Sequence, residues 1–369
     1  MLYADLQLRC LCDASGRANG YSGVSGGPIT LVSVGYPLFP VSRDISGGAE
    51  QILSIVEHAL VRAGNESLVV AAEGSRVSGK LISTPGPDTA QLTDEMRTRA
   101  QQITARTLET VLARYSVDLV HFHGLDFHAY IPRTTVPMLA TLHLPLSWYP
   151  DSIFNLKNVQ LNCVSRSQAE GTGLPVVLNG VDTSWYRPAS EKDDYLLWLG
   201  RVCPEKGVEI ALRAAHALDM QLLVAGPVHA FESHRKYFEE CIAPLLDGKR
   251  RHIGPVSGRE KRDLLARAQC LLVPSLVAET SSLVAMEALS SGTPVVAARS
   301  GALPEVVDDG RTGFIVDSEQ DMADAVRRLG EINPEICRRT AVARFEQSRM
   351  INDYMNLYES LTRQPTARV

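Results

Sequence analysis

The sequence lacks any apolar run that approaches the roughly 18 residues needed to span a membrane as a helix. Its first 28 residues also lack the basic start, long apolar stretch and small-residue cleavage site of a secretory signal. Long basic runs are missing too, and the net charge of −5 gives no indication of a nucleic-acid partner. We therefore expect a cytoplasmic protein in which residues 1–28, with their Gly and Ser content, form a loose tail.

Cysteine is present without any pattern of pairing. The residues are odd in number and scattered, and several lie inside apolar stretches, so we expect no disulfide framework and a reducing compartment. Cys10 and Cys12 have no matching pair of ligands nearby in sequence, which favours free thiols over a metal site. The seven cysteines are Cys10, Cys12, Cys163, Cys203, Cys241, Cys270 and Cys337.

From residue 29 onward, short apolar runs alternate with amphipathic helical stretches, which is typical of a parallel sheet with helices on both faces. The first series of expected strands covers residues 29–34, 67–72, 119–122, 138–142, 160–164 and 176–178. Helices are expected at about 49–63 and 92–115. The second series of strands covers residues 195–199, 221–225, 251–253, 270–273 and 294–298. Its helices are expected near 207–218, 231–246, 257–268 and from about 281.

The two series predict two domains, as the length of 369 residues also favours. We expect an α/β protein with two doubly wound, Rossmann-like domains at residues 29–185 and 193–344, facing each other across a cleft. Ligands of such folds bind outside the carboxyl ends of the strands. In residues 345–369, apolar and aromatic side chains recur at helical spacing, which predicts a last helix that crosses back to the first domain. A helix wholly within the second domain is the alternative.

Two glycine-marked turns follow strands and open helices, where free N–H groups favour an anion. Gly47 and Gly48 mark the turn after the first strand. Arg201 and Lys206 belong to the turn LGRVCPEKG, and two cations beside a helix N-terminus suit a diphosphate. The alternatives are glycines that serve turn geometry alone and cations that lie on a surface loop.

The stretch ETSSLVAMEALSSGTPVV predicts a buried helix followed by a buried strand, yet it carries Glu279 and Glu287. A buried carboxylate is costly unless it is paired. Ser281 or Ser282 is a good N-cap, which would place Glu279 beside the free N–H groups of Ser282, Leu283 and Val284. Glu287 would then lie roughly 7–9 Å further along the helix. Two structural ion pairs, or one ligand that contacts both acids at different depths, would each explain the pattern.

These motifs, taken in order, resemble the retaining GT-B glycosyltransferases of family four. The donor half of that family is similar to GRVCPEKG followed by ETSSLVAME. Further similar pieces are ISGGAEQIL, DLVHFH, PMLATLH, NCVSRSQ, VVLNGVD, LLVAGP, IGPVSGREKRDLLARAQCLLVPS and ALPEVVDDGRTGFIV. The likeness covers roughly residues 29–360, and it implies the GT-B fold and transfer of a sugar from a nucleotide.

The resemblance implies a role for each turn in binding the donor. Gly47 and Gly48 would face the donor diphosphate from the first domain. Arg201 and Lys206 would hold the same diphosphate from the second. Glu279 would contact the hydroxyls of the transferred sugar.

The same resemblance implies the rest of the donor site. Backbone amides near Ser282 and Leu283 would lie beside the transferred sugar, and Glu287 would hold the ribose. Gly226 and Val256 would line the nucleobase pocket. One departure is visible: family members often carry Pro before the first Glu and Phe-Gly after it, whereas this chain reads AETSSL. The donor sugar is therefore left open.

His121 and His123 lie on one face of an expected strand. They could form a metal pair, although an H-x-H site needs further ligands. We favour a structural role for His121, and the resemblance implies that His123 approaches the donor sugar or the acceptor. Glu305 is interpreted as a capping or packing acid. Aromatic residues of the first domain could stack on a sugar ring or pack in the core: Tyr36, Phe39, Phe127, Tyr130, Trp148 and Tyr149.

The resemblance therefore implies a retaining glycosyltransferase with a nucleotide-diphosphate sugar as donor. The acceptor would be a hydroxyl of a carbohydrate, a lipid-linked molecule or a small molecule, in cell-envelope or exopolysaccharide assembly. No essential metal is implied, and the inner face of the membrane is a candidate for peripheral contact. A nucleotide-sugar epimerase or hydrolase, and a non-catalytic sugar-nucleotide-binding protein of the same fold, are the alternatives.

Overall fold

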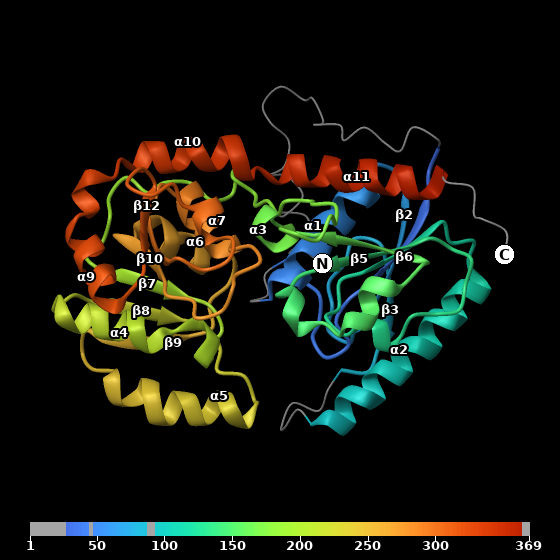
Figure 1. Ribbon diagram of the computed structural model, residues 1–369, viewed down its shortest axis with the longest axis horizontal. Helices are drawn as coiled ribbons and strands as arrows, with labels where there is room; N and C mark the ends of the chain where they lie inside the picture. The colour runs from blue at the N-terminus through green and yellow to red at the C-terminus, as the bar shows by residue number, and fades with distance from the viewer. Residues whose placement is uncertain (1–26, 44–46, 87–92, 364–369) are drawn as a thin grey trace, which may run out of the picture.

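Two six-stranded parallel sheets form the centres of two domains in the computed structural model (Figure 1). The structure describes residues 27–43, 47–86 and 93–363. The predicted tail, apart from its last two residues, and Cys10 and Cys12 lie outside these residues. The predicted α/β fold of two doubly wound domains is confirmed.

The first sheet has the strand order β3-β2-β1-β4-β5-β6. Its strands are β1 (Thr30–Val34), β2 (Glu66–Ala72), β3 (Lys80–Thr84), β4 (Leu119–Phe122), β5 (Met138–Leu142) and β6 (Val159–Cys163). The second sheet repeats the pattern as β12-β11-β10-β7-β8-β9. Its strands are β7 (Leu196–Leu199), β8 (Leu222–Ala225), β9 (Arg250–Gly254), β10 (Cys270–Val273), β11 (Val295–Ala298) and β12 (Gly313–Val316).

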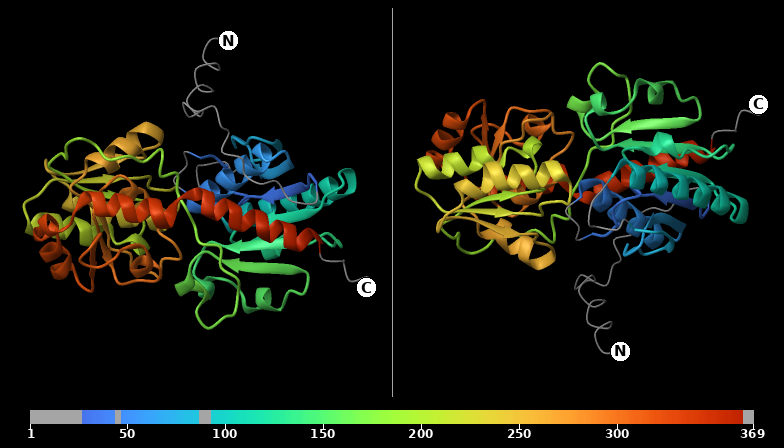
Figure 2. Two further views of the ribbon diagram at one scale, coloured as in Figure 1. Left: turned by 90° about the horizontal axis from the view of Figure 1, so that it is seen from above. Right: turned by 90° about the horizontal axis from the view of Figure 1, so that it is seen from below.

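Helices cover both faces of each sheet (Figures 1 and 2). Those of the first domain are α1 (Gly48–Arg62), α2 (Asp94–Arg114) and α3 (Arg166–Ala169). Those of the second are α4 (Val208–Ala217), α5 (Glu232–Tyr237), α6 (Gly258–Arg267), α7 (Leu283–Ser290), α8 (Leu303–Val306), α9 (Glu319–Arg327) and α10 (Pro334–Phe345). The last helix is α11 (Gln347–Arg363).

Predicted strands agree with the structure to within one residue at each end, with three exceptions. Residues 176–178 were expected to form a strand, but only Val176 pairs, through a single bridge to Cys163. Strand β3 was not expected, because this edge strand is mostly exposed or half-buried and lacks a continuous apolar run. The short strand β12 was not expected either.

Two predicted helices have different bounds. The helix expected at 231–246 is broken into α5, a wider helical turn (Phe238–Ile242) and a 3-10 turn (Ala243–Leu245) that contains Pro244. Proline has no N–H group, so it cannot donate the next helical hydrogen bond. The helix expected from residue 345 is α11, which begins at Gln347. Phe345 is instead the last residue of α10, and Glu346 separates the two helices.

Helices α10 and α11 run almost in line across both domains, along the top of Figure 1. Helix α11 packs against α1 of the first domain, and its Tyr354 and Tyr358 are fully buried there. The chain thus crosses between the domains twice. The two crossings pair side by side, since Val181 N donates to Phe345 O and Gln347 N donates to Val181 O.

Glu305 adds a polar contact between the domains. Its carboxylate accepts hydrogen bonds from the backbone N–H groups of Arg166 and Ser167, at the start of α3. An acid at a helix N-terminus satisfies otherwise unpaired donors. The interpretation of Glu305 as a capping acid is confirmed.

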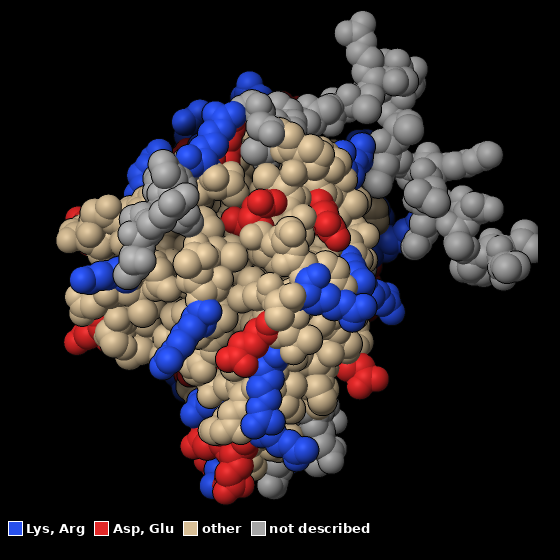
Figure 3. Space-filling model, turned by 90° about the vertical axis from the view of Figure 1, so that its right-hand side faces the viewer, with Lys and Arg blue, Asp and Glu red and all other residues tan. Residues whose placement is uncertain are grey.

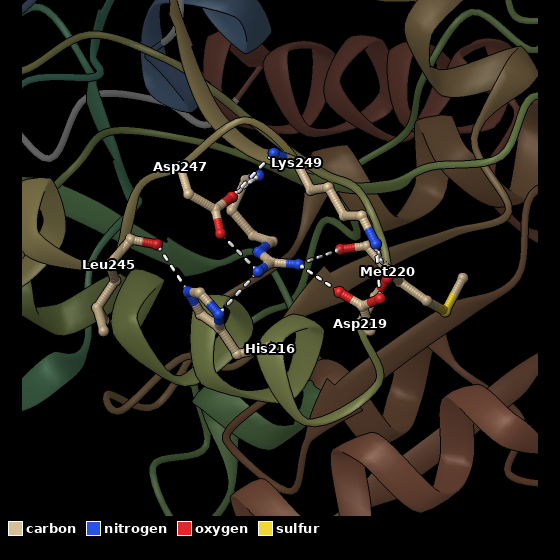
Figure 4. A network of polar contacts seen from close by, with 7 residues as sticks. His216, Asp219, Met220, Leu245, Asp247 and Lys249 are labelled. Carbon is tan, nitrogen blue, oxygen red and sulfur yellow. Dashed lines mark hydrogen bonds and ion pairs between the residues drawn. The ribbon is translucent and has the colours of Figure 1, made fainter.

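A buried cation fixes the far edge of the second sheet, at β9 (Figure 4). The Arg250 side chain is 8% exposed and donates to Asp247, Asp219 and the Met220 carbonyl. It also contacts His216, whose other ring nitrogen bonds the Leu245 carbonyl. This network joins β9 to α4 and to the turn before β8, far from any predicted site residue.

The surface carries charges of both signs. Figure 3 shows the outer end of the first domain, where acidic and basic side chains are interspersed. No helix among the described residues combines the length and the apolar character that crossing a membrane requires. The five described cysteines are free, as expected.

Candidate active site

A cleft of about 460 Å³ lies between the two domains, where the carboxyl ends of both sheets meet. Residues that directly follow strands line it from each side, among them His123 after β4, His143 after β5 and Gly226 after β8. The cleft brings together all of the predicted site residues: Gly47, Gly48, His123, Arg201, Lys206, Gly226, Val256, Glu279, Ser282, Leu283 and Glu287.

The glycine turn of the first domain faces the second domain across the cleft. Gly47 is the N-cap of α1 and has no side chain to occupy the adjacent N–H groups. A Cβ atom at Gly48 would lie 3.5 Å from Cδ1 of Leu283, which belongs to the second domain. Glu50, also on the cleft wall, is buried, and burial raises the pKa of its carboxyl group.

The cationic turn follows β7 and depends on Gly207. This residue has φ of +60° and caps α4, and a Cβ atom there would collide with the Pro274 carbonyl oxygen. Only glycine adopts this conformation without strain and leaves room for that oxygen. The turn therefore directs Lys206 into the cleft, where its ammonium lies 2.5 Å from Glu279 Oε1.

Glu279 lies in the loop before α7, with 10% of its side chain exposed. It accepts from Lys206 and from the Ser275 hydroxyl. The Lys206 ammonium, a full positive charge, binds the carboxylate in the free protein, and the position beside the amides of Ser282 and Leu283 stays a prediction. Ser282 is the N-cap of α7, as expected, but its side chain makes no capping hydrogen bond.

Glu287 lies one turn into α7 and is 3% exposed. Its carboxylate forms an ion pair of 2.6 Å with Lys261 and accepts from the Tyr186 hydroxyl at 2.8 Å. Burial, followed by the charge of Glu287, raises the pKa of Tyr186 far above its usual value. Both acids of the α7 region are thus paired with a lysine, and both lie on the cleft wall.

The histidines divide as the pattern suggested. His121 is fully buried, and its two ring nitrogens bond Tyr358 and Thr141 at 2.8 Å each, which confirms a structural role. His123 Nδ1 lies 3.1 Å from His143 Nε2. Burial lowers the pKa of both, that of His143 to about 3, so each ring is neutral at pH 7. Among the described residues, these histidines belong to no group of three close ligands.

Gly226 and Val256 lie beside each other at the ends of β8 and β9. Gly226 has φ of +149°, and a Cβ atom there would overlap the carbonyl oxygen of Gly200. The Gly226 carbonyl accepts from His252 at 2.8 Å. The backbone of Gly226 thus packs directly against that of Gly200 on this part of the wall.

The six aromatic residues of the first domain fall into two groups. Phe127, Tyr130 and Tyr149 are buried in the core. Tyr36, Phe39 and Trp148 line the cleft, and Trp148 is 46% exposed. These three form an apolar surface opposite the cations of the second domain.

Two facing Rossmann-like domains, with a cationic turn and paired acids between them, define the GT-B class. Residues 193–331 match the family model of glycosyl transferases group 1, so the second domain belongs to that family. A D-inositol 3-phosphate glycosyltransferase from Nocardioides sp. is 34% identical over 51% of this chain and 47% of its own length. One from Salinispora tropica is 30% identical over 56% and 50%. The chain spans about half the length of these curated relatives.

Solved structures match nearly the whole chain. AviGT4, a glycosyltransferase involved in avilamycin A biosynthesis, is 26% identical with a TM-score of 0.68, over 92% of this chain and 99% of that one. Anabaena HepE in complex with UDP and glucose is 17% identical with a TM-score of 0.68, over 90% and 100%, and it shows the fold alone.

Proposed function

We propose that the protein is a retaining glycosyltransferase that moves a sugar from a nucleoside diphosphate to an acceptor hydroxyl. The placement of Arg201 and Lys206 carries this proposal. Both cations line the cleft at the turn before α4, and Gly47 and Gly48 lie on the opposite wall. A diphosphate between them would meet two positive charges and the N–H groups at the start of α1.

We assign the remaining predicted residues to the ribose, the transferred sugar and the nucleobase of the donor. Glu287, deep in α7, would accept from the ribose diol, and Glu279 would accept from hydroxyls of the transferred sugar. Gly226 and Val256 would contact the nucleobase through the exposed backbone at the ends of β8 and β9. In the free protein, Lys206 is held by Glu279, so its ammonium is already oriented before the diphosphate binds.

The proposed reaction breaks the bond between the anomeric carbon and the phosphate oxygen. The acceptor hydroxyl forms the new bond on the same face, and its proton passes to the leaving phosphate oxygen, so no separate base is required. Arg201 and Lys206 stabilise the charge that develops on the diphosphate. His123, neutral because of burial, would donate or accept a hydrogen bond at the sugar rather than supply charge.

The acceptor side of the cleft has a different chemistry. Among the described lining residues, the Arg and Lys side chains are Arg201, Lys206 and Lys261, and all belong to the second domain. The first domain offers neutral histidines and an apolar surface that includes Trp148. We therefore propose a neutral hydroxyl acceptor with an apolar face, such as a glycoside, in cytoplasmic polysaccharide assembly. The curated relatives, by contrast, are named for a phosphorylated cyclitol.

This acceptor assignment predicts the outcome for a matched pair of acceptors. A neutral polyol or glycoside should react with a higher kcat/KM than its phosphate monoester, because no described Arg or Lys of the first domain lines the cleft. Initial rates at fixed donor concentration measure the ratio. Preference for the phosphate monoester would contradict the assignment.

The proposed function can be tested by binding. A nucleotide sugar that binds only the folded state stabilises it by about 2.7 kcal/mol at 100 times Kd. A panel of nucleotide sugars should therefore contain at least one that raises the melting temperature, and Lys206→Ala should reduce that rise. If the whole panel leaves the melting temperature of the wild-type protein unchanged, the donor assignment is wrong.

We also expect activity to survive excess EDTA, because Arg201 and Lys206 supply the charge that a divalent metal would otherwise provide. Rates before and after chelation, with dialysis as the control, measure this. Full loss that zinc or manganese restores would favour the hydrolase alternative. Release of free sugar without acceptor would favour it as well.

A further inference from the structure

A second group of side chains lies on the cleft wall, beside the cationic turn. Cys203 and Glu205 belong to that turn, and His234 comes from α5. Their ligand atoms lie within 4.8 Å of one another. The thiol of Cys203 is 2% exposed, and the other two side chains are partly buried. Three side chains from two elements, the cationic turn and α5, thus converge on one point.

Two polar atoms of this group are buried without a partner. Glu205 Oε2 and His234 Nδ1 have no hydrogen-bond partner among the described residues. Buried polar atoms are usually satisfied, so two unpartnered atoms on residues of one close group leave room for a ligand between them. Because one atom is a carboxylate oxygen and the other a ring nitrogen, a cation would satisfy both.

The donor set identifies the class of cation. One thiolate, one imidazole and one carboxylate are the ligands of a borderline-soft divalent metal, and zinc accepts all three in a tetrahedral site. We propose that Cys203, Glu205 and His234 bind a Zn²⁺ ion on the cleft wall. The fourth position is then open to water or to an oxygen of a bound ligand.

Binding of the metal requires a thiolate and a neutral imidazole. Burial raises the pKa of Cys203 to about 11, so the thiol must lose its proton to the solvent when the metal binds. Burial also lowers the pKa of His234, which keeps the imidazole in its neutral, ligating form. Metal affinity therefore rises with pH. The bound ion would join the turn to α5 without taking part in turnover, which is expected to survive chelation.

Cobalt is a spectroscopic probe of such a site. The full-length protein with Cys10→Ser and Cys12→Ser serves as the parent, so that these two thiols do not contribute. One equivalent of Co²⁺ should produce a thiolate-to-cobalt charge-transfer band and the visible bands of tetrahedral cobalt. One equivalent of Zn²⁺ should remove both and raise the melting temperature by mass action.

Matched variants locate the metal. Cys203→Ser and His234→Ala should each lose the charge-transfer or visible bands, whereas Cys241→Ser and His128→Ala, which alter exposed residues, should keep them. His234 is partly exposed, so its replacement leaves a folded protein even if the Cys203 variant is unstable. The proposal is overturned if the parent shows no bands, or if the bands persist unchanged in His234→Ala.

Discussion

Replacing Lys206 or Arg201 by Ala should lower turnover by a factor on the order of 10² or more, because each removes a positive charge from the departing diphosphate. The melting temperature of the Arg201 variant should change little, since its side chain lines an open cleft. Lys206→Ala also leaves Glu279, 10% exposed, without its counter-charge and should lower the melting temperature. Steady-state rates beside thermal unfolding separate the two effects. Near-normal activity in both variants would remove the diphosphate assignment.

Lys236→Ala is the matched control for this pair. Lys236 lies on the same domain, is 62% exposed and pairs with Glu232 one helical turn away. An exposed pair of this kind contributes little to stability. The control should therefore keep full activity, and a loss equal to that of Lys206→Ala would point to a general effect of charge.

Replacing Glu279 and Glu287 by Gln should have different effects on nucleotide affinity and on turnover. Glu287→Gln removes a charge-assisted contact with the ribose, at roughly 1.5–3 kcal/mol for each hydrogen bond. It should weaken binding of the bare nucleoside diphosphate as well as binding of the sugar nucleotide. Glu279→Gln keeps an oxygen that can accept from Lys206, so affinity for the diphosphate should be nearly unchanged. Turnover should fall, because in the proposed complex the carboxylate contacts the sugar. Titration calorimetry of both ligands, beside initial rates, measures the difference.

The ion pair of Glu287 adds an effect on stability. Glu287→Gln leaves Lys261, 12% exposed, without its counter-charge, and breaking a buried pair costs roughly 3–5 kcal/mol. The double variant Glu287→Gln with Lys261→Met removes that unpaired charge and should recover the melting temperature without recovering nucleotide affinity. If Glu279→Gln weakens binding of the bare nucleoside diphosphate as much as Glu287→Gln does, the assignment of Glu279 to the sugar and Glu287 to the ribose is wrong.

The sequence could predict the elements that carry continuous apolar runs and the turns between them. Strands β4, β5 and β10 have the predicted bounds, because each is buried along its whole length. The edge strand β3 has no such run, since most of its residues face solvent or are half-buried. Helix α11 shows helical spacing, but its break from α10 depends on the pairing of Glu346 with Val181 in the other crossing.

The sequence could predict which residues line the site, but not which side chains they contact. Glu287 stands out as a charge in an apolar helix, whereas Lys261 and Tyr186 lie 26 and 101 residues away with no mark in the sequence. His143 could have been found, because it directly follows β5, which pairs with the strand before His123. The group of Cys203, Glu205 and His234 needed the three-dimensional structure, since α5 approaches the turn only in the fold.

The configuration of the product tests the central claim most directly. With the nucleotide sugar that stabilises the protein and a neutral acceptor, proton NMR of the product reports the coupling of the transferred anomeric proton. We predict the same anomeric configuration as in the donor, with one nucleoside diphosphate released for each new glycosidic bond. An inverted configuration, or free sugar formed in place of a glycoside, would contradict the account.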